Sequence, residues 1–208
     1  TQRRRQRQMC IRDRLITWCQ PHNIYIILDM HCAPGAQNGG PISDSDGIAR
    51  LWLEDSYKEL TIQIWKEIAT YYADHTLIAG YDLINEPVLP SGVSLVEFKQ
   101  LYVDITEAIR EVDNNHLIWI EGNWCGTDFA GLTPPWDDNM GYSFHKYWGQ
   151  TDITTIQSYI NMRNNYGVPL WMGESGENSN HWSYEVFKLL EENNICLLYT
   201  SPSPRDGI

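Results

Sequence analysis

The stretch that decides the fold is Ile78-Ala-Gly-Tyr-Asp-Leu-Ile-Asn-Glu-Pro87. Its apolar residues predict a buried strand over residues 78–85. Pro87 has no backbone N–H and ends the hydrogen-bond ladder, which leaves Asn85 and Glu86 at the carboxyl end of this strand. A capping-box pattern, Ser94-Leu-Val-Glu97, then predicts the start of a helix.

The same alternation of strand and helix recurs along the chain. Short apolar runs alternate with longer segments whose apolar residues have helical spacing, and such units form a parallel sheet with right-handed crossovers. No Gly-x-Gly-x-x-Gly follows a predicted strand, so nothing supports a dinucleotide site. The predicted strands are 25–29, 78–85, 117–120, 141–145 and 168–172, and the predicted helices are 56–75, 94–109, 153–165 and 182–192.

Polar residues gather just past the ends of these strands. An α/β barrel takes its site residues from the carboxyl ends of several strands, whereas an open, doubly wound sheet concentrates them at one switch point. Five strands contribute here, so the pattern favours a barrel. The residues are His31, Asn85, Glu86, Asn123, Trp124, His145, Tyr147 and Glu174.

Glu86 and Glu174 are the strand-end carboxylates suited to acid–base chemistry. Glycoside hydrolysis needs two such groups, one to protonate the leaving oxygen and one to attack the sugar or activate water. A retaining mechanism places them about 5–5.5 Å apart, and an inverting one roughly 6.5–9.5 Å. A single strand-end Glu commonly caps a helix or pairs with Arg, but the whole set favours a glycosidase.

Four segments resemble glycoside hydrolase family 5, and they stand in that family's order. Residues 81–87 resemble its Asn-Glu-Pro segment, 27–39 its third-strand segment, 144–147 its His-x-Tyr and 171–176 its nucleophile strand. The resemblance implies an α/β fold, a partial (β/α)8 TIM barrel with about five of eight strands, the third to the seventh. It also implies a retaining, cellulase-like endo- or exo-β-glucanase.

The resemblance further implies a role for each site residue. Glu86 would be the general acid/base and Glu174 the nucleophile. Asn85 would hydrogen-bond the sugar 2-hydroxyl, and Tyr147 would hydrogen-bond Glu174 and keep it ionised. His31 and His145 would line the catalytic subsite. Among the rim tryptophans, Trp124 is the strongest candidate for stacking on a sugar ring, ahead of Trp136 and Trp148.

Several alternatives stay open at this point. The protein could be a β-mannanase of the same family, or this chain a non-catalytic carbohydrate-binding fragment. A metal-dependent barrel hydrolase would use Asp29, His31 and His145, but the chain has no His-x-His on one strand. Glu177 is a weaker rival for the nucleophile, and we interpret Glu121 as a rim or structural carboxylate. Gln37 and Asn38 either contact sugar hydroxyls or form a turn.

The two ends of the chain differ from the rest. Residues 8–14 and 196–201 can be encoded by DNA strings that are largely reverse complements and that resemble a sequencing-library transposase end. We therefore expect residues 1–14 and 196–208 to be non-native tails around a catalytic domain over 15–195. Without them the formal net charge changes from −12 to −17, which suits neutral substrates and not polyanions.

The remaining expectations concern partners and completeness. We expect no cofactor and no metal, a polysaccharide or oligosaccharide substrate, no nucleic acid, no membrane association and a monomer. No signal peptide is visible, although the family suggests a secreted or cell-surface protein. The family's first, second and eighth strands have no counterpart here, so we expect an open barrel with little activity.

Overall fold

The computed structural model describes residues 2–197, and the side chains of residues 11–197. Six strands form one sheet: β1 (Ile26–Asp29), β2 (Ile78–Asp82), β3 (Leu117–Glu121), β4 (Met140–His145), β5 (Leu170–Glu174) and β6 (Cys196–Leu197). The helices are α1 (Gln2–Cys19), α2 (Asp55–Tyr72), α3 (Leu95–Arg110), α4 (Asn123–Gly126), α5 (Gln157–Tyr166) and α6 (Asn180–Glu192). None of these helices is long and apolar enough to cross a bilayer.

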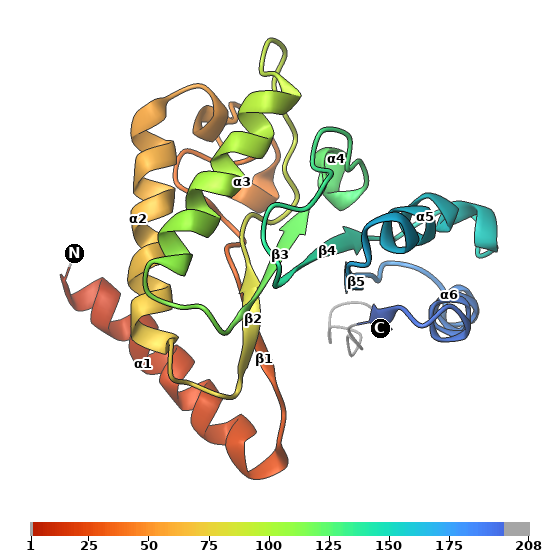
Figure 1. Ribbon diagram of the computed structural model, residues 1–208, viewed down its shortest axis with the longest axis horizontal. Coiled ribbons are helices and arrows are strands. Elements are labelled where there is room, and N and C mark those ends of the chain that lie inside the picture. Colours follow the sequence, from red (N-terminus) through yellow and green to blue (C-terminus); the bar gives the residue numbers. More distant parts are fainter. Residues whose placement is uncertain (1, 198–208) are drawn as a thin grey trace.

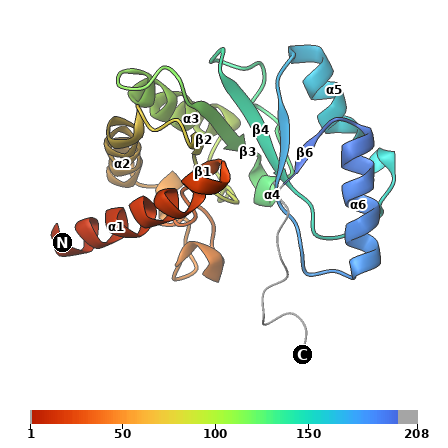
Figure 2. The same cartoon turned by 90° about the horizontal axis from the view of Figure 1, so that it is seen from below.

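The sheet is parallel throughout, and its strands are neighbours in chain order from β1 to β6. A doubly wound sheet would reverse its order at a switch point, whereas a barrel wall does not. Helices α2 and α3 lie beside β1 to β3, and α5 and α6 lie beyond β4 and β5 (Figures 1 and 2). The order of the strands therefore confirms the prediction of a partial barrel and not that of an open, doubly wound sheet.

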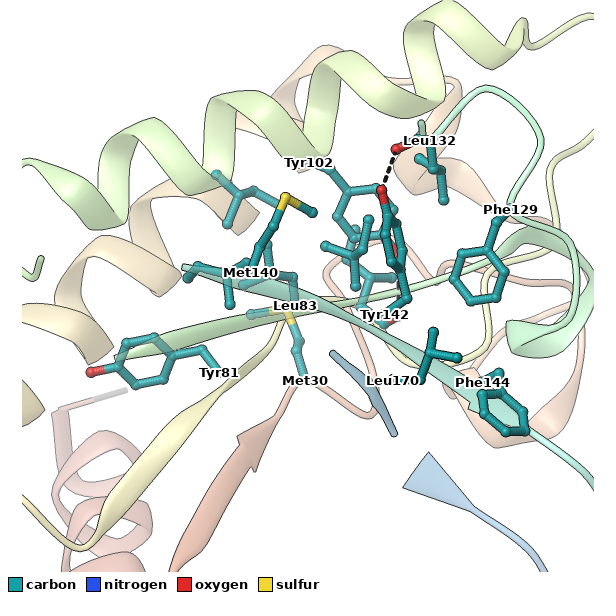
Figure 3. Packing of buried hydrophobic residues seen from close by; sticks show 14 of the residues in the cluster. Met30, Tyr81, Leu83, Tyr102, Phe129, Leu132, Met140, Tyr142, Phe144 and Leu170 are labelled. Carbon is teal, nitrogen blue, oxygen red and sulfur yellow. Dashed lines mark hydrogen bonds between the residues drawn. The ribbon is translucent and has the colours of Figure 1, made fainter. Parts of the chain in front are cut away.

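The outward face of the sheet packs against the helices through large buried side chains. Tyr142 on β4 and Tyr102 on α3 are both fully buried, and the Tyr142 hydroxyl donates to the carbonyl of Leu132 at 3.1 Å (Figure 3). The Trp65 indole of α2 donates to the carbonyl of Leu83 at 2.8 Å. These bonds satisfy the polar ends of aromatic side chains inside an apolar layer.

The opposite face carries the polar residues. Side chains alternate across a strand, so Ser143 and His145 share the face opposite Tyr142. A cavity of about 250 Å³ opens on this inner face, and Asp82, Glu121, His145 and Gly173 are among its lining residues. The alternation thus directs the chemistry-bearing side chains of several strands into one space.

Two differences from the predicted elements have simple causes. Strand β2 ends at Asp82, not Asn85, because the chain then bends: Leu83 N–H donates to Trp119 and Asn85 N–H donates to Met30. The sheet has six strands where about five were expected, since Cys196–Leu197 adds beside β5. That pair is too short to show any periodicity in sequence.

The predicted tails coincide with described structure only in part. Helix α1 includes most of residues 1–14, and β6 includes Cys196 and Leu197. Residue 1 and residues 198–208 lie outside the described part of the chain. The non-native origin of both tails stays a prediction.

Candidate active site

Glu86 and Glu174 face each other at the carboxyl end of the sheet. Glu174 is the last residue of β5, and Glu86 follows the bend after β2. One oxygen of each carboxylate and a ring nitrogen of His145 all lie within 4.8 Å of one another. A separation this short is consistent with a retaining pair, whose carboxyl groups lie about 5–5.5 Å apart, and not with an inverting pair at roughly 6.5–9.5 Å.

Tyr147 distinguishes the two carboxylates. Its hydroxyl donates to Glu174 Oε2 at 2.7 Å. Burial and this bond to Glu174 raise the pKa of Tyr147, so the phenol keeps its proton and remains a donor. The contact predicted between Tyr147 and Glu174 is therefore present, and it holds one oxygen of Glu174 in place.

His145 lies between three carboxylates, and its side chain is only 2% exposed. Its Nδ1 is 2.8 Å from Glu86 Oε1 and 3.7 Å from Glu174 Oε2, while its Nε2 is 3.2 Å from Glu121 Oε1. Burial disfavours the charged ring, but the hydrogen bonds to Glu121 and Glu86 outweigh it and raise the pKa of His145 to about 11. The ring is therefore an imidazolium that donates from both nitrogens.

The backbone around Glu86 is unusual and held from two sides. Glu86 has φ of 46°, in the left-handed region that residues other than glycine seldom adopt. Its N–H donates to Glu121 Oε2 at 2.7 Å, and its carbonyl accepts from the Asn38 amide at 2.8 Å. The Gln37 amide donates to the carbonyl of Asn85 at 2.7 Å. Gln37 and Asn38, both buried, thus fasten this backbone.

Asn85 lies on the inner face beside this pair. Asn85 is only 1% exposed, and its Nδ2 has no hydrogen-bond partner among the described residues. A buried amide donor without a partner costs about 1–3 kcal/mol. The geometry leaves this donor available to a ligand group that enters the inner cavity, which Asn85 lines.

His31 lies near Glu174 but is more exposed than His145. Its Nδ1 is 3.0 Å from Asp29 Oδ2 and 3.8 Å from Glu174 Oε1, and its side chain is 55% exposed. The hydrogen bond to Asp29 raises the pKa of His31, against the effect of burial. Asp29 and His31 pair with each other and not with His145, so the predicted metal set Asp29, His31 and His145 does not assemble.

A cleft of about 560 Å³ opens over the two carboxylates. Trp148, 64% exposed, lines it beside Glu86 and Glu174, whereas Trp124, 62% exposed, is not among its lining residues. The structure therefore favours Trp148 over the predicted Trp124 as an aromatic wall of this cleft. Trp136 packs beneath Lys99 and donates from its indole to Thr106, away from the cleft.

Two acidic residues of the inner face were missed as site residues. Glu121, interpreted from sequence as a rim or structural carboxylate, ends β3 and contacts both Glu86 and His145. Burial raises the pKa of Glu121 to about 7, with the bond to His145 opposing the rise. Asp82 lies close by, and burial together with Glu121 raises its pKa well above the usual range. Their position at strand ends was the available signal.

The rival nucleophile has no comparable environment. Glu177 is exposed, follows the loop after β5 and has φ of 51°. It lines the outer cleft but lacks the tyrosine contact that Glu174 receives. The geometry therefore favours Glu174.

Relatives with curated descriptions are glycosidases by name. The chain is 37% identical over 138 residues to a "Beta-xylosidase" of Phanerodontia chrysosporium, covering 65% of this chain and 28% of that protein. It is 28% identical over 137 residues to "Endoglucanase C" of Acetivibrio thermocellus, covering 65% and 38%. A "Probable glucan 1,3-beta-glucosidase A" of Aspergillus fumigatus is 25% identical over 117 residues, covering 56% and 28%. The chain thus spans well under half of these relatives' length.

Solved structures share the fold. A structure of Thermotoga maritima Cel5A in complex with mannotriose superposes with a TM-score of 0.77 at 18% identity, covering 97% of this chain and 72% of that one. The cellulose synthase subunit Z of Clostridioides difficile gives a TM-score of 0.79 at 17% identity, covering 98% and 75%. These matches agree with a partial barrel wall of six parallel strands.

A sequence profile covers almost the whole chain. It is described as "Cellulase (glycosyl hydrolase family 5)" and matches residues 4–203. Since that match spans nearly the whole chain, including Glu86, His145 and Glu174, this chain belongs to glycoside hydrolase family 5.

Proposed function

We propose that the protein containing this chain hydrolyses β-glycosidic bonds of a β-glucan by a retaining double displacement. The observation that carries the proposal is the carboxylate pair, with oxygens of Glu86 and Glu174 within 4.8 Å. Tyr147 donates to Glu174 Oε2 at 2.7 Å, and this contact supports Glu174 as the nucleophile.

The proposed mechanism has two steps. Glu174 attacks the anomeric carbon while Glu86 gives its proton to the departing glycosidic oxygen, and a covalent glycosyl ester forms on Glu174. Glu86, now a carboxylate, removes a proton from water, which attacks the anomeric carbon and releases Glu174. In both steps the unpartnered Asn85 amide donates to the sugar 2-hydroxyl, a contact that strengthens in the transition state.

The choice of a glucan as substrate is more specific than membership of the family, and it follows from the names of relatives. Two of the relatives above are called an endoglucanase and a glucan 1,3-β-glucosidase, and a third a β-xylosidase. A panel of aryl β-glucosides, β-xylosides and β-mannosides, with cello- and laminari-oligosaccharides, measures the preference. Faster turnover of the xyloside or mannoside would replace the glucan proposal while leaving the mechanism intact.

The mechanism is tested by stereochemistry and by trapping. Proton NMR of the first product should show the β-anomer. A 2-deoxy-2-fluoro-β-glucoside with a good leaving group should label Glu174, identified by peptide mapping. An α-anomer as first product, or label on Glu177, would contradict the assignment. Activity should be unchanged by a chelator, whereas a metal-dependent hydrolase would be inhibited.

A further inference from the structure

We propose that Glu121 is a positioning residue that holds Glu86 at both its backbone and its carboxylate. The inference rests on the proposed function, in which Glu86 is the acid/base. Glu121 lies at the end of β3, 35 residues from Glu86 in sequence. Its two carboxylate oxygens divide the task between them.

The first oxygen fixes the backbone. Glu121 Oε2 accepts the Glu86 N–H at 2.7 Å. Glu86 has a left-handed φ of 46°, a conformation that costs roughly 1–3 kcal/mol unless the surroundings enforce it. A charge-assisted bond to a buried carboxylate is among the stronger enforcing contacts available. Glu121 therefore stabilises the bend that directs the Glu86 side chain into the cleft.

The second oxygen acts through a ring. Glu121 Oε1 is 3.2 Å from His145 Nε2, and His145 Nδ1 is 2.8 Å from Glu86 Oε1. The side chains of Glu121 and His145 are each only 2% exposed, so bulk water does not compete for these bonds. His145 thus transmits the position of Glu121 to the carboxylate of Glu86.

The surroundings leave Glu121 and His145 little freedom. A side chain added at Gly126 would place its Cβ 3.2 Å from both Glu121 Oε2 and His145 Cγ. Because glycine has no Cβ, the backbone at this position can pack closely against both side chains. Below them, the Tyr102 hydroxyl of α3 donates to the Glu121 carbonyl at 2.9 Å. Glu121 is therefore held by the scaffold at the point where it contacts Glu86 and His145.

The arrangement has a kinetic consequence. A general acid works only when it reaches the leaving oxygen within about 2.6–3.2 Å. Substrates with poor leaving groups need that proton, whereas activated aryl glycosides leave with little help. Loss of Glu121 should therefore slow the first class and spare the second, a pattern that general destabilisation would not produce.

The principal test is Glu121→Gln, compared with Glu107→Gln, the same change at an exposed site on α3. Gln can still accept the Glu86 N–H, but its NH2 opposes the Nε2–H of His145. In the full protein we expect kcat/KM to fall about 10- to 100-fold for an alkyl or oligosaccharide β-glycoside. For the 2,4-dinitrophenyl glycoside the fall should be under about threefold. Equal losses for both substrates, or none, would overturn the proposal.

A second readout needs no turnover. The groups that face the His145 ring are Glu86, Glu121, Glu174 and, through space, Asp82. Nitrogen NMR of histidine-labelled chain should show His145 protonated on both nitrogens at neutral pH. In Glu121→Gln its titration should fall by more than about one pH unit. An unchanged titration in a folded variant would show that Glu121 does not hold the ring.

Further measurements separate three outcomes: misfolding of a variant, failure of the proposed function and failure of the inference about Glu121. Glu121→Asp keeps the charge but is too short to span both contacts, so it should give the same leaving-group pattern if Gln fails to fold. If the fluoroglycoside does not label wild-type Glu174, the proposed function fails. If labelling succeeds while Glu121→Gln and Glu121→Asp leave the ratio of the two substrates unchanged, the inference about Glu121 fails.

Discussion

At the scale of the residue, the site depends on single hydrogen bonds between buried or partly buried side chains. Tyr147 gives one bond to Glu174, and His145 gives one each to Glu86 and Glu121. Each bond joins a charged group to a donor from a different strand or loop. Such bonds are stronger than neutral ones and depend on geometry, so small changes here should have large kinetic effects.

Tyr147→Phe removes the donor and keeps the ring. Glu174 then loses the contact that orients it, and we expect kcat to fall about 10- to 100-fold with KM nearly unchanged. Steady-state kinetics on an aryl β-glycoside measure this. Tyr184→Phe, at an exposed tyrosine of α6, is the matched control and should have no effect.

Trp148→Ala and Trp124→Ala form a pair that tests which indole contacts substrate. The cleft includes Trp148 and not Trp124. Stacking on a sugar is worth about 1–2 kcal/mol, so Trp148→Ala should raise KM for oligosaccharides about tenfold. Trp124→Ala should change KM less than about twofold, because Trp124 does not line the cleft and should not stack on the substrate. The reverse result would restore the prediction made from sequence for Trp124.

At the scale of the element, the local signals were read correctly where the cause is local. The capping box at the start of α3 is present, with Glu97 N–H donating to Ser94 Oγ at 3.2 Å and Ser94 N–H to Glu97 Oε2 at 2.9 Å. The end of β2 was predicted three residues too late because the bend at Leu83 depends on bonds to β3 and β1. No pattern within the strand itself contains that information.

The connection from α3 to β3 contains a buried carboxylate that should make stability depend on pH. Asp113 accepts from Tyr81 Oη at 2.7 Å and from Asn115 N–H at 2.9 Å, and it pairs with His116. Burial opposes ionisation, but these bonds outweigh it and lower the pKa of Asp113. The stabilisation is therefore present above the ordinary Asp pKa and is lost as the pH falls through the lowered value.

Asp113→Asn should thus destabilise the fold by about 2–3 kcal/mol at pH 7, and by progressively less below about pH 4. Urea unfolding at a series of pH values measures the difference. Asp74→Asn, at an exposed aspartate beyond α2, is the control. A deficit that stays constant into acid would contradict the role assigned to Asp113.

At the scale of the whole molecule, the order of polar residues along the chain predicted the fold better than it predicted the contacts within the site. Polar residues after successive strands indicated a barrel, and the parallel sheet in chain order agrees. Glu86, His145, Glu174 and Tyr147 come together as expected. The contacts of Glu121 with Glu86 and His145 join it to residues 35 and 24 positions away in opposite directions. A sequence pattern does not encode such contacts.

The described sheet has outer edges at β1 and β6, and neither has a further neighbour among residues 2–197. Ile24 and Tyr25, just before β1, are 53% and 69% exposed. Unpaired edges beside apolar residues favour association between chains. The monomer expected for the parent protein presumes a closed barrel.

Tyr25→Lys should therefore reduce association of the 208-residue chain by placing a charge beside the β1 edge. Sedimentation velocity over a range of concentrations should show a smaller oligomeric fraction than for the unaltered chain. Tyr166→Lys, at a 43% exposed tyrosine that ends α5 away from this edge, should leave the fraction unchanged. Equal effects of both variants would point to net charge as the cause.

The left-handed backbone at Glu86 also bears on how this protein can change over evolutionary time. A residue that tolerates positive φ, such as Gly or Asn, would relieve about 1 kcal/mol of strain at position 86. Glu86→Asn should recover this strain energy but lose the 2.8 Å bond from His145 Nδ1, so its free energy of unfolding should stay close to that of the unaltered chain while catalysis is lost. The gain in backbone strain and the loss of this bond roughly cancel, so stability alone gives no reason to prefer Glu over Asn at position 86.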